Sequence, residues 1–159
     1  MIRTGIGYDV HKLGKDSDLV IGGITIPYEF GSIGHSDGDG LIHAIVDAIL
    51  GAAGLGDIGK YFPSESKEWK NCSSSYFLSE TVKLIRKSGF EIVNIDSTVV
   101  LEKPKLKKYI PLIVNNLSLI MGKETACISV KATTTDGLGF AGTGEGWSVF
   151  AIATLNQKL

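Results

Sequence analysis

The chain contains three histidines, all within its first 43 residues and each close to carboxylates. Asp9 and His11 form an Asp-x-His pair, His35 begins the segment HSDGDG, and His43 follows that segment. Imidazole and carboxylate groups bind borderline divalent metals such as Zn²⁺, and three protein ligands with one open position are typical of a catalytic site. If Asp9, His11 and His43 converge, the sequence predicts a metal-assisted enzyme.

Two expected elements would bring these ligands together. Residues 2–11 alternate as a strand does, so Asp9 and His11 share one face. Ser36, Asp37 and Asp39 are all plausible caps for a helix over 41–53, which carries His43. Asp47 lies one turn after His43, where it either orients the imidazole ring or is a solvated helix-surface residue.

His35 has two interpretations. It could be a fourth ligand that closes a structural site, or it could donate to a substrate and leave the site open. Its position just before the Ser36–Asp37 cap predicts a helix N-terminus, where anions are favoured. We therefore favour the substrate role.

The segment from Lys131 to Gly137, KATTTDG, ends an expected strand and enters a glycine-rich turn. Its hydroxyls, backbone N–H groups and lysine suit phosphate oxygens, although a threonine-rich strand end is also common. Asp136 could hold Mg²⁺ or Mn²⁺, and Asp57 could face a polar substrate or simply cap a turn. No nucleophile–base pair is visible, which favours phosphoryl transfer because that chemistry needs little covalent help from protein.

The remaining pattern predicts one α+β domain over 1–159, a four-stranded mixed sheet with helices on one face. Residues 147–155 are apolar on both sides of the expected strand, so the second sheet face should pack against other subunits. The other expected elements are a bent strand over 20–27, a long surface loop over 56–72, a helix after Ser73–Ser75 to Lys87, a strand over 90–101, a helix over 106–121 and a strand over 128–132.

The composition excludes several classes of protein. A formal net charge of −1 indicates no nucleic-acid partner and no membrane-surface partner, and the apolar stretch 41–55 is too short and too polar to cross a bilayer. Cys72 and Cys127 belong to no C-x-x-C pair and are expected to be free thiols. With no export signal visible at the N-terminus, we expect a cytoplasmic protein.

Four motifs stand together in one order: GYDVH at 7–11, GHSDGD at 34–39 with His43, LGDIGKYFP at 55–63, and VKATTTD at 130–136 followed by Gly139 and Phe140. Across essentially its whole length the chain resembles the 2-C-methyl-D-erythritol 2,4-cyclodiphosphate synthase family of the non-mevalonate isoprenoid pathway. The resemblance implies a homotrimer packed through its sheets, with active sites between adjacent subunits.

The resemblance also implies a reaction and its metals. The family's substrate is 4-diphosphocytidyl-2-C-methyl-D-erythritol 2-phosphate, whose 2-phosphate attacks its own β-phosphorus and releases CMP, as in a phosphorus–oxygen lyase. Zn²⁺ would be held by Asp9, His11 and His43, and Mg²⁺ or Mn²⁺ would lie on the diphosphate near Asp136. His35 and Thr134 would stabilise the transition state.

The substrate contacts implied by the resemblance include two groups with defined roles. Asp57, Ile58 and Gly59 would hold the erythritol hydroxyls, and Leu101 to Lys107 with Ala132 and Thr133 would form the cytosine pocket. The full set of implied contacts is Asp9, His11, His35, Ser36, Asp57, Ile58, Gly59, Phe62, Pro63, Ser64, Glu65, Ser66, Leu101, Glu102, Lys103, Pro104, Lys105, Leu106, Lys107, Ala132, Thr133, Thr134, Thr135, Asp136, Phe140 and Thr143.

The chain departs from the family pattern at three places. Residues 63–66 read PSES where members commonly have PDTD, and Asp136 replaces a more usual Glu. Thr143 and Phe150 replace an Arg and a Glu that in some members point into the central trimer cavity, so the charge that would anchor an isoprenoid diphosphate is missing. Two rival functions are a metal-dependent phosphohydrolase and a non-catalytic, metal-stabilised oligomer.

Overall fold

A computed structural model describes residues 1–157 as an α+β fold built on a five-stranded mixed sheet in the order β4-β1-β7-β5-β6. The pairs β4–β1, β1–β7 and β7–β5 are antiparallel, and the pair β5–β6 is parallel. The strands are β1 (Ile2–Gly14), β4 (Gly31–Ile33), β5 (Phe90–Val100), β6 (Ile128–Thr133) and β7 (Gly146–Gln157), with a separate hairpin of β2 (Leu19–Ile21) and β3 (Ile24–Ile26).

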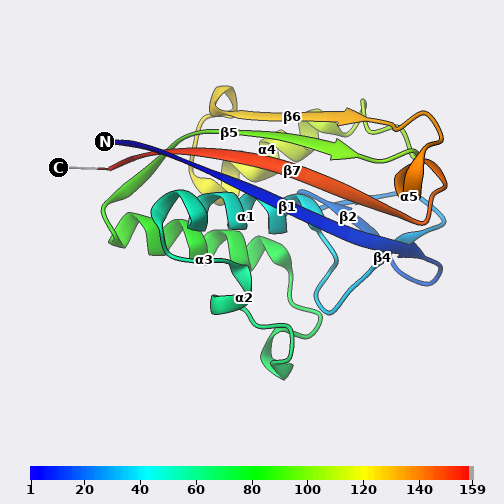
Figure 1. Ribbon diagram of the computed structural model, residues 1–159, viewed down its shortest axis with the longest axis horizontal. Coiled ribbons are helices and arrows are strands. Elements are labelled where there is room, and N and C mark those ends of the chain that lie inside the picture. Colours follow the sequence, from blue (N-terminus) through cyan, green and yellow to red (C-terminus); the bar gives the residue numbers. More distant parts are fainter. Residues whose placement is uncertain (158–159) are drawn as a thin grey trace.

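The helices cover one face of the sheet, and Figure 1 shows α1 and α3 side by side along that face. Left-handed glycines close two of these helices, Gly54 after α1 and Gly122 after α4, as helix C-termini favour. The helices are α1 (Gly40–Ala53), α2 (Ile58–Tyr61), α3 (Ser74–Lys87), α4 (Ile110–Met121) and α5 (Gly139–Gly142), with 3₁₀ turns η1 (Lys67–Trp69) and η2 (Thr125–Cys127).

The predicted fold class is confirmed, with corrections to its details. The main sheet has five strands and not four, because the short edge strand β4 pairs with the end of β1. Three residues cannot show an alternating pattern, so this strand left no periodic signal. The bent strand over 20–27 is the β2–β3 hairpin, the 56–72 loop contains α2 and η1, and α4 begins at Ile110 instead of 106. The predicted domain 1–159 includes Lys158 and Leu159, which lie outside the described residues.

One hydrophobic core lies between the sheet and the helices. It combines α1 residues such as Ile42 and Ile49 with Trp147 and Val149 of β7, all fully buried. The opposite face of the sheet carries exposed large apolar side chains, which are Ile6, Tyr8 and Val10 of β1 and Phe150 and Ile152 of β7. We call these five residues the apolar sheet face.

The structure also bears on the predictions about the cysteines and about membrane-spanning helices. Cys72 and Cys127 are free thiols, as predicted. Within residues 1–157, no helix combines the length and apolar character needed to cross a membrane.

Candidate metal centre and substrate pockets

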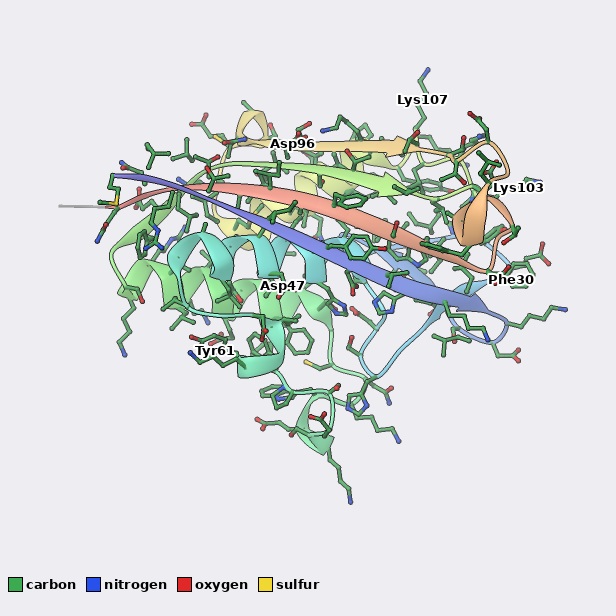
Figure 2. The ribbon with its side chains drawn as sticks, in the orientation of Figure 1. Phe30, Asp47, Tyr61, Asp96, Lys103 and Lys107 are labelled. Carbon is green, nitrogen blue, oxygen red and sulfur yellow. The ribbon has the colours of Figure 1, made fainter. Side chains whose placement is uncertain are left out.

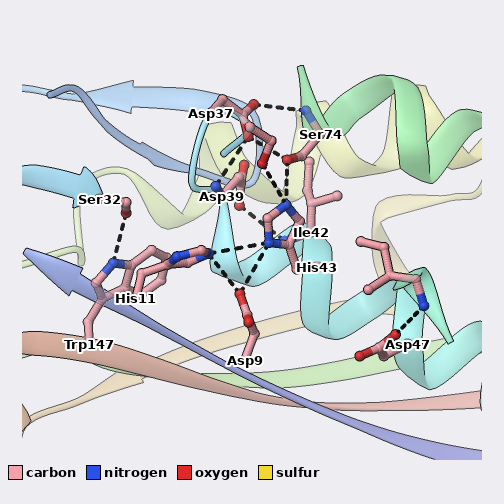
Figure 3. A network of polar contacts seen from close by, with 12 residues as sticks. Asp9, His11, Ser32, Asp37, Asp39, Ile42, His43, Asp47, Ser74 and Trp147 are labelled. Carbon is pink, nitrogen blue, oxygen red and sulfur yellow. Dashed lines mark hydrogen bonds and ion pairs between the residues drawn. The ribbon is translucent and has the colours of Figure 1, made fainter. Parts of the chain in front are cut away.

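Asp9, His11 and His43 converge as the sequence predicts, and Figure 3 shows their polar atoms facing one another. Asp9 Oδ2 lies 2.9 Å from His11 Nε2 and 3.2 Å from His43 Nδ1, and the two nitrogens are 3.3 Å apart. A tetrahedral ion with bonds of about 2.0–2.1 Å separates its ligand atoms by about 3.3 Å. The two nitrogens and one oxygen therefore fit a Zn²⁺-like ion in both chemistry and spacing.

The charges of these three groups are coupled. Burial by itself raises the pKa of Asp9, but hydrogen bonds to His11 and His43 and their positive charge outweigh burial and lower it to about 2. Burial by itself lowers the pKa of His43, but its hydrogen bond to Asp9 and the nearby carboxylates raise it. The pocket therefore stabilises positive charge beside Asp9, which a bound cation would also supply.

Glycines allow the strand and the helix that carry the ligands to approach closely. A Cβ atom on Gly7 would lie 1.9 Å from the backbone oxygen of Ala44, next to His43 on α1. A Cβ atom on Gly5 would lie 2.1 Å from Ala48 O. Because β1 and α1 touch backbone to backbone here, the His43 ring can reach Asp9 and His11 two and four residues further along the strand.

A cavity of about 250 Å³ opens beside the candidate metal ligands. Seven of the predicted substrate contacts line it together with His43, and two aromatic side chains, Trp69 and Phe77, complete the wall. The predicted residues in this wall are His11, His35, Ser36, Ile58, Gly59, Phe62 and Ser64. We call this cavity the metal-side pocket.

A second cavity, of about 300 Å³, lies between the ends of β5 and β6 and the segment after β5. It is lined by Leu101, Pro104, Lys105, Leu106, Lys107, Ala132, Thr133 and Thr134, all predicted contacts, and by Ile110. We call it the strand-end pocket. The two cavities share no lining residue, and Figure 2 shows Lys107 pointing away from the side of the molecule that carries Tyr61. Within one chain, the structure therefore divides the predicted contacts into two separate groups.

The other predicted contacts lie outside the linings of these two pockets, and some of them form hydrogen bonds with one another or with a lining residue. Thr134 Oγ1 donates to Asp136 Oδ1 at 3.3 Å, and Thr135 N donates to Glu102 Oε2 at 3.3 Å. Leu101, Glu102, Lys103 and Thr143 line a further cavity of about 270 Å³. Asp57, Pro63, Glu65, Ser66 and Phe140 line neither of the two pockets, although Ser66 O contacts His35 Nε2 at 3.2 Å.

Two local interpretations need correction, and Asp57 adopts one of the two roles expected for it. Asp47 neither orients His43 nor is free in solvent, because its Oδ1 accepts from Ile58 N at 2.8 Å and so fixes the start of α2. Asp39 alone is the N-cap of α1, so His35 lies five residues before the helix and not at its N-terminus. Asp57 caps α2, accepting from Lys60 N at 3.0 Å.

The model of the YgbB family matches residues 2–156. The chain belongs to the YgbB family. Proteins named 2-C-methyl-D-erythritol 2,4-cyclodiphosphate synthase are similar to it: one from Clostridium botulinum is 50% identical over 155 residues, covering 98% of this chain and 100% of the relative. Another, from Clostridium kluyveri, is 51% identical over 158 residues, covering 99% and 96%.

Solved structures also resemble this YgbB chain. The bifunctional IspDF from Campylobacter jejuni superposes with a TM-score of 0.95 at 41% identity, covering 99% of this chain and 42% of that one. A CDP complex of IspF from Plasmodium falciparum superposes with a TM-score of 0.87 at 36% identity, covering 99% and 97%.

Sequence reasoning missed several residues of this YgbB site. Trp69 and Phe77 line the metal-side pocket, and their rings, with Phe62, form a contiguous aromatic group. Aromatic residues at 61–62, 69 and 76–77, about seven residues apart, were the available signal. Ser74, which contacts His43, left no such signal because one serine in a run of three resembles an ordinary helix cap.

Proposed function

We propose that this chain converts 4-diphosphocytidyl-2-C-methyl-D-erythritol 2-phosphate to 2-C-methyl-D-erythritol 2,4-cyclodiphosphate with release of CMP. The supporting observation is full-length membership of the YgbB family, together with relatives of about half-identical sequence that carry the synthase name. The converged Asp9, His11 and His43 beside a substrate-sized cavity support a metal-assisted form of this reaction.

Asp9, His11 and His43 would hold the metal, which we propose is Zn²⁺, one per subunit. When bound, such an ion offsets the negative charge of the phosphate groups. Asp136, near the Thr134 hydroxyl, would contact a second cation, Mg²⁺ or Mn²⁺, carried by the substrate diphosphate.

The protein's own residues would act by positioning. The attacking 2-phosphate is already ionised at neutral pH, so it needs no general base, in keeping with the absence of a nucleophile–base pair from the sequence motifs. Holding two anionic groups of one substrate together is proximity catalysis. His35 and Thr134 would stabilise the transition state from the metal-side and strand-end pockets respectively.

The remaining roles are assigned by the family resemblance. Asp57, Ile58 and Gly59 would hold the erythritol hydroxyls, with Phe62 to Ser66 covering them. Leu101 to Lys107 with Ala132 and Thr133 would bind the cytosine largely through backbone groups. The similar IspF from Plasmodium falciparum was solved as a CDP complex, which supports a cytidine diphosphate ligand for this chain.

Because one substrate must contact both pockets, we propose that they meet between subunits of a homotrimer. The two cavities share no lining residue within a chain, and the apolar sheet face is exposed on the isolated subunit. Packing that face against two further copies would remove it from water and bring the strand-end pocket of one copy to the metal-side pocket of the next.

The deciding experiment incubates the purified protein with Zn²⁺, Mg²⁺ and the substrate, and analyses the products by phosphorus NMR. We expect a cyclic diphosphate and CMP in equal amounts. Release of linear phosphate instead would indicate a phosphohydrolase and contradict the proposal.

A variant tests the metal site. His43→Ala removes one ligand, so we expect bound zinc and activity to fall by more than about 100-fold, since even partners outside the ligand set contribute 10–100-fold. The circular dichroism spectrum should keep the wild-type shape. A fully active His43→Ala protein would refute the zinc assignment.

A further inference from the structure

Helix α3 begins directly beside the candidate metal ligands. Ser74, its first residue, is fully buried, and its backbone N–H donates to Asp37 Oδ2 at 2.8 Å. The Ser74 hydroxyl donates to the other oxygen of the same carboxylate, Asp37 Oδ1. Ser73 occupies the N-cap position but makes no side-chain cap bond, so Asp37 supplies the cap from 37 residues away.

The donor and acceptor roles in this cluster follow from the carboxylate. An ionised carboxylate only accepts, so the Ser74 hydroxyl proton points to Asp37. Ser74 Oγ also lies 2.8 Å from His43 Nε2, and with its own proton already donated it can only accept there. His43 Nε2 must therefore carry a proton. Figure 3 shows this chain of contacts from Asp37 through Ser74 to the imidazole ring.

The opposite ring nitrogen is the one that faces the other candidate ligands. His43 Nδ1 lies 3.2 Å from Asp9 Oδ2 and 3.3 Å from His11 Nε2. Without a metal, Nδ1 can also carry a proton and donate it to Asp9. A metal binds only a bare nitrogen, so it takes the place of that proton, while the Nε2 proton stays bonded to Ser74 Oγ.

We propose that Asp37 and Ser74 are positioning residues that hold His43 as its Nε2–H tautomer and thereby present Nδ1 to a divalent metal. This inference rests on the metal site of the proposed function. Asp37 and Ser74 do not contact the metal in this proposal. They raise its affinity through His43, and this effect is separate from their capping of α3. Ser36 Oγ, 3.2 Å from the same Nε2, can share that proton but does not change which nitrogen carries it.

The test measures zinc dissociation constants by chelator competition for wild type, Ser74→Ala and Ser73→Ala. Ser73→Ala is the matched control, because it removes a neighbouring, exposed hydroxyl that makes no cap bond. We expect Ser74→Ala to weaken zinc binding by about 10–100-fold, as is typical of partners that orient a ligand. Ser73→Ala should match wild type. The melting temperature of each metal-free protein reports the capping effect separately.

The outcomes separate this inference from the proposed metal site. If wild type binds no zinc, the metal site itself is wrong and the inference falls with it. If wild type binds zinc and Ser74→Ala binds it equally well, the metal site stands and the positioning role alone is refuted.

A measurement on unmodified protein covers the case in which Ser74→Ala does not fold. Long-range proton–nitrogen NMR of the three imidazoles, in metal-free protein at alkaline pH, identifies the protonated nitrogen of His43. We expect the proton on Nε2. A proton on Nδ1 would overturn the proposal.

Discussion

At the scale of single residues, Asp39 shows how one side chain can join distant segments. Its fully buried carboxylate accepts from Gly22 N at 2.9 Å, Gly23 N at 2.6 Å and Ile42 N at 3.1 Å. These bonds attach the turn between β2 and β3 to the first turn of α1. Burial nevertheless raises the Asp39 pKa to about 6, because the three N–H groups only partly replace lost hydration.

This raised pKa predicts a pH dependence of stability. Between its ordinary value of 3.8 and about 6, folded Asp39 binds more protons than unfolded Asp39, so its contribution falls as the pH rises through that window. The total change is about 3 kcal/mol at about 1.4 kcal/mol per pKa unit. Asp39→Asn lacks this titration. Urea unfolding of both metal-free proteins should show wild type losing about that much stability relative to the variant between these pH values.

The opposite trend would contradict the prediction. If wild type gains stability over Asp39→Asn as the pH rises, the three N–H donors outweigh burial and hold the carboxylate in its charged form.

Thr81 is expected to lower the free energy of unfolding through a buried polar atom. Its Oγ1 is buried in α3 and has no hydrogen-bond partner among the described residues. Thr81→Val replaces the hydroxyl with a methyl group of similar size, so we expect the free energy of unfolding to rise by about 1–2 kcal/mol. Chemical denaturation measures the change, and Thr81→Ser, which keeps the hydroxyl, is the control. A less stable Thr81→Val protein would indicate that the hydroxyl has a partner such as bound water.

At the scale of elements, the packing of α1 on β1 creates the candidate metal site. Asp9 and His11 share the β1 face that carries Gly5 and Gly7, and those glycines let α1 rest on the strand backbone. The ligand atoms from the two elements are only about 3 Å apart, so a shift of about 1 Å between strand and helix would spoil the coordination.

Gly7→Ala tests this dependence. Its new Cβ would meet Ala44 O at 1.9 Å, which must push the helix away, so we expect a loss of about 3 kcal/mol or more in stability and weaker zinc binding. Gly51→Ala, in α1 with nothing within 4 Å of the added atom, is the control and should stabilise the protein by about 0.5–1 kcal/mol. Equal stability of the two variants would show that the close approach is not required.

At the scale of the whole molecule, the apolar sheet face is a hydrophobic surface that the isolated chain leaves in contact with water. Ile6 is 69% exposed, and Tyr8 and Phe150, neighbours with ring centroids 4.9 Å apart, are each 47% exposed. Contiguous apolar surface of this kind marks association sites. The apolar sheet face lies on β1 and β7 in the middle of the sheet, which agrees with the proposed packing of sheets against one another.

Ile6→Glu tests the role of this face. A buried charge would oppose assembly, so we expect sedimentation velocity to show monomers and activity to fall at least about 100-fold, while circular dichroism stays unchanged. Leu119→Glu, on an 82% exposed residue of α4, should assemble as wild type does. An Ile6→Glu protein that assembles as wild type does, or a wild-type protein that is monomeric at micromolar concentration, would contradict the proposed assembly.

Much of the fold and the ligand set followed from local patterns. Alternation along 2–11 placed Asp9 and His11 on one face, and helical periodicity over 41–53 placed His43 on α1, as the structure confirms. Such periodic patterns can be read from the sequence alone, because each shows which side of a strand or helix faces the core.

Other features depend on contacts between residues remote in the chain, and only the tertiary structure could decide them. Asp47 binds Ile58 and not His43, Asp37 caps a helix that starts at Ser74, and His35 and Thr134 lie at separate pockets of one subunit. The sequence by itself determined which side chains can bind a metal and which face of each element they occupy. The packing of α1 on β1 decided whether they meet, because distances between elements depend on how their surfaces fit and not on the order of residues within either one.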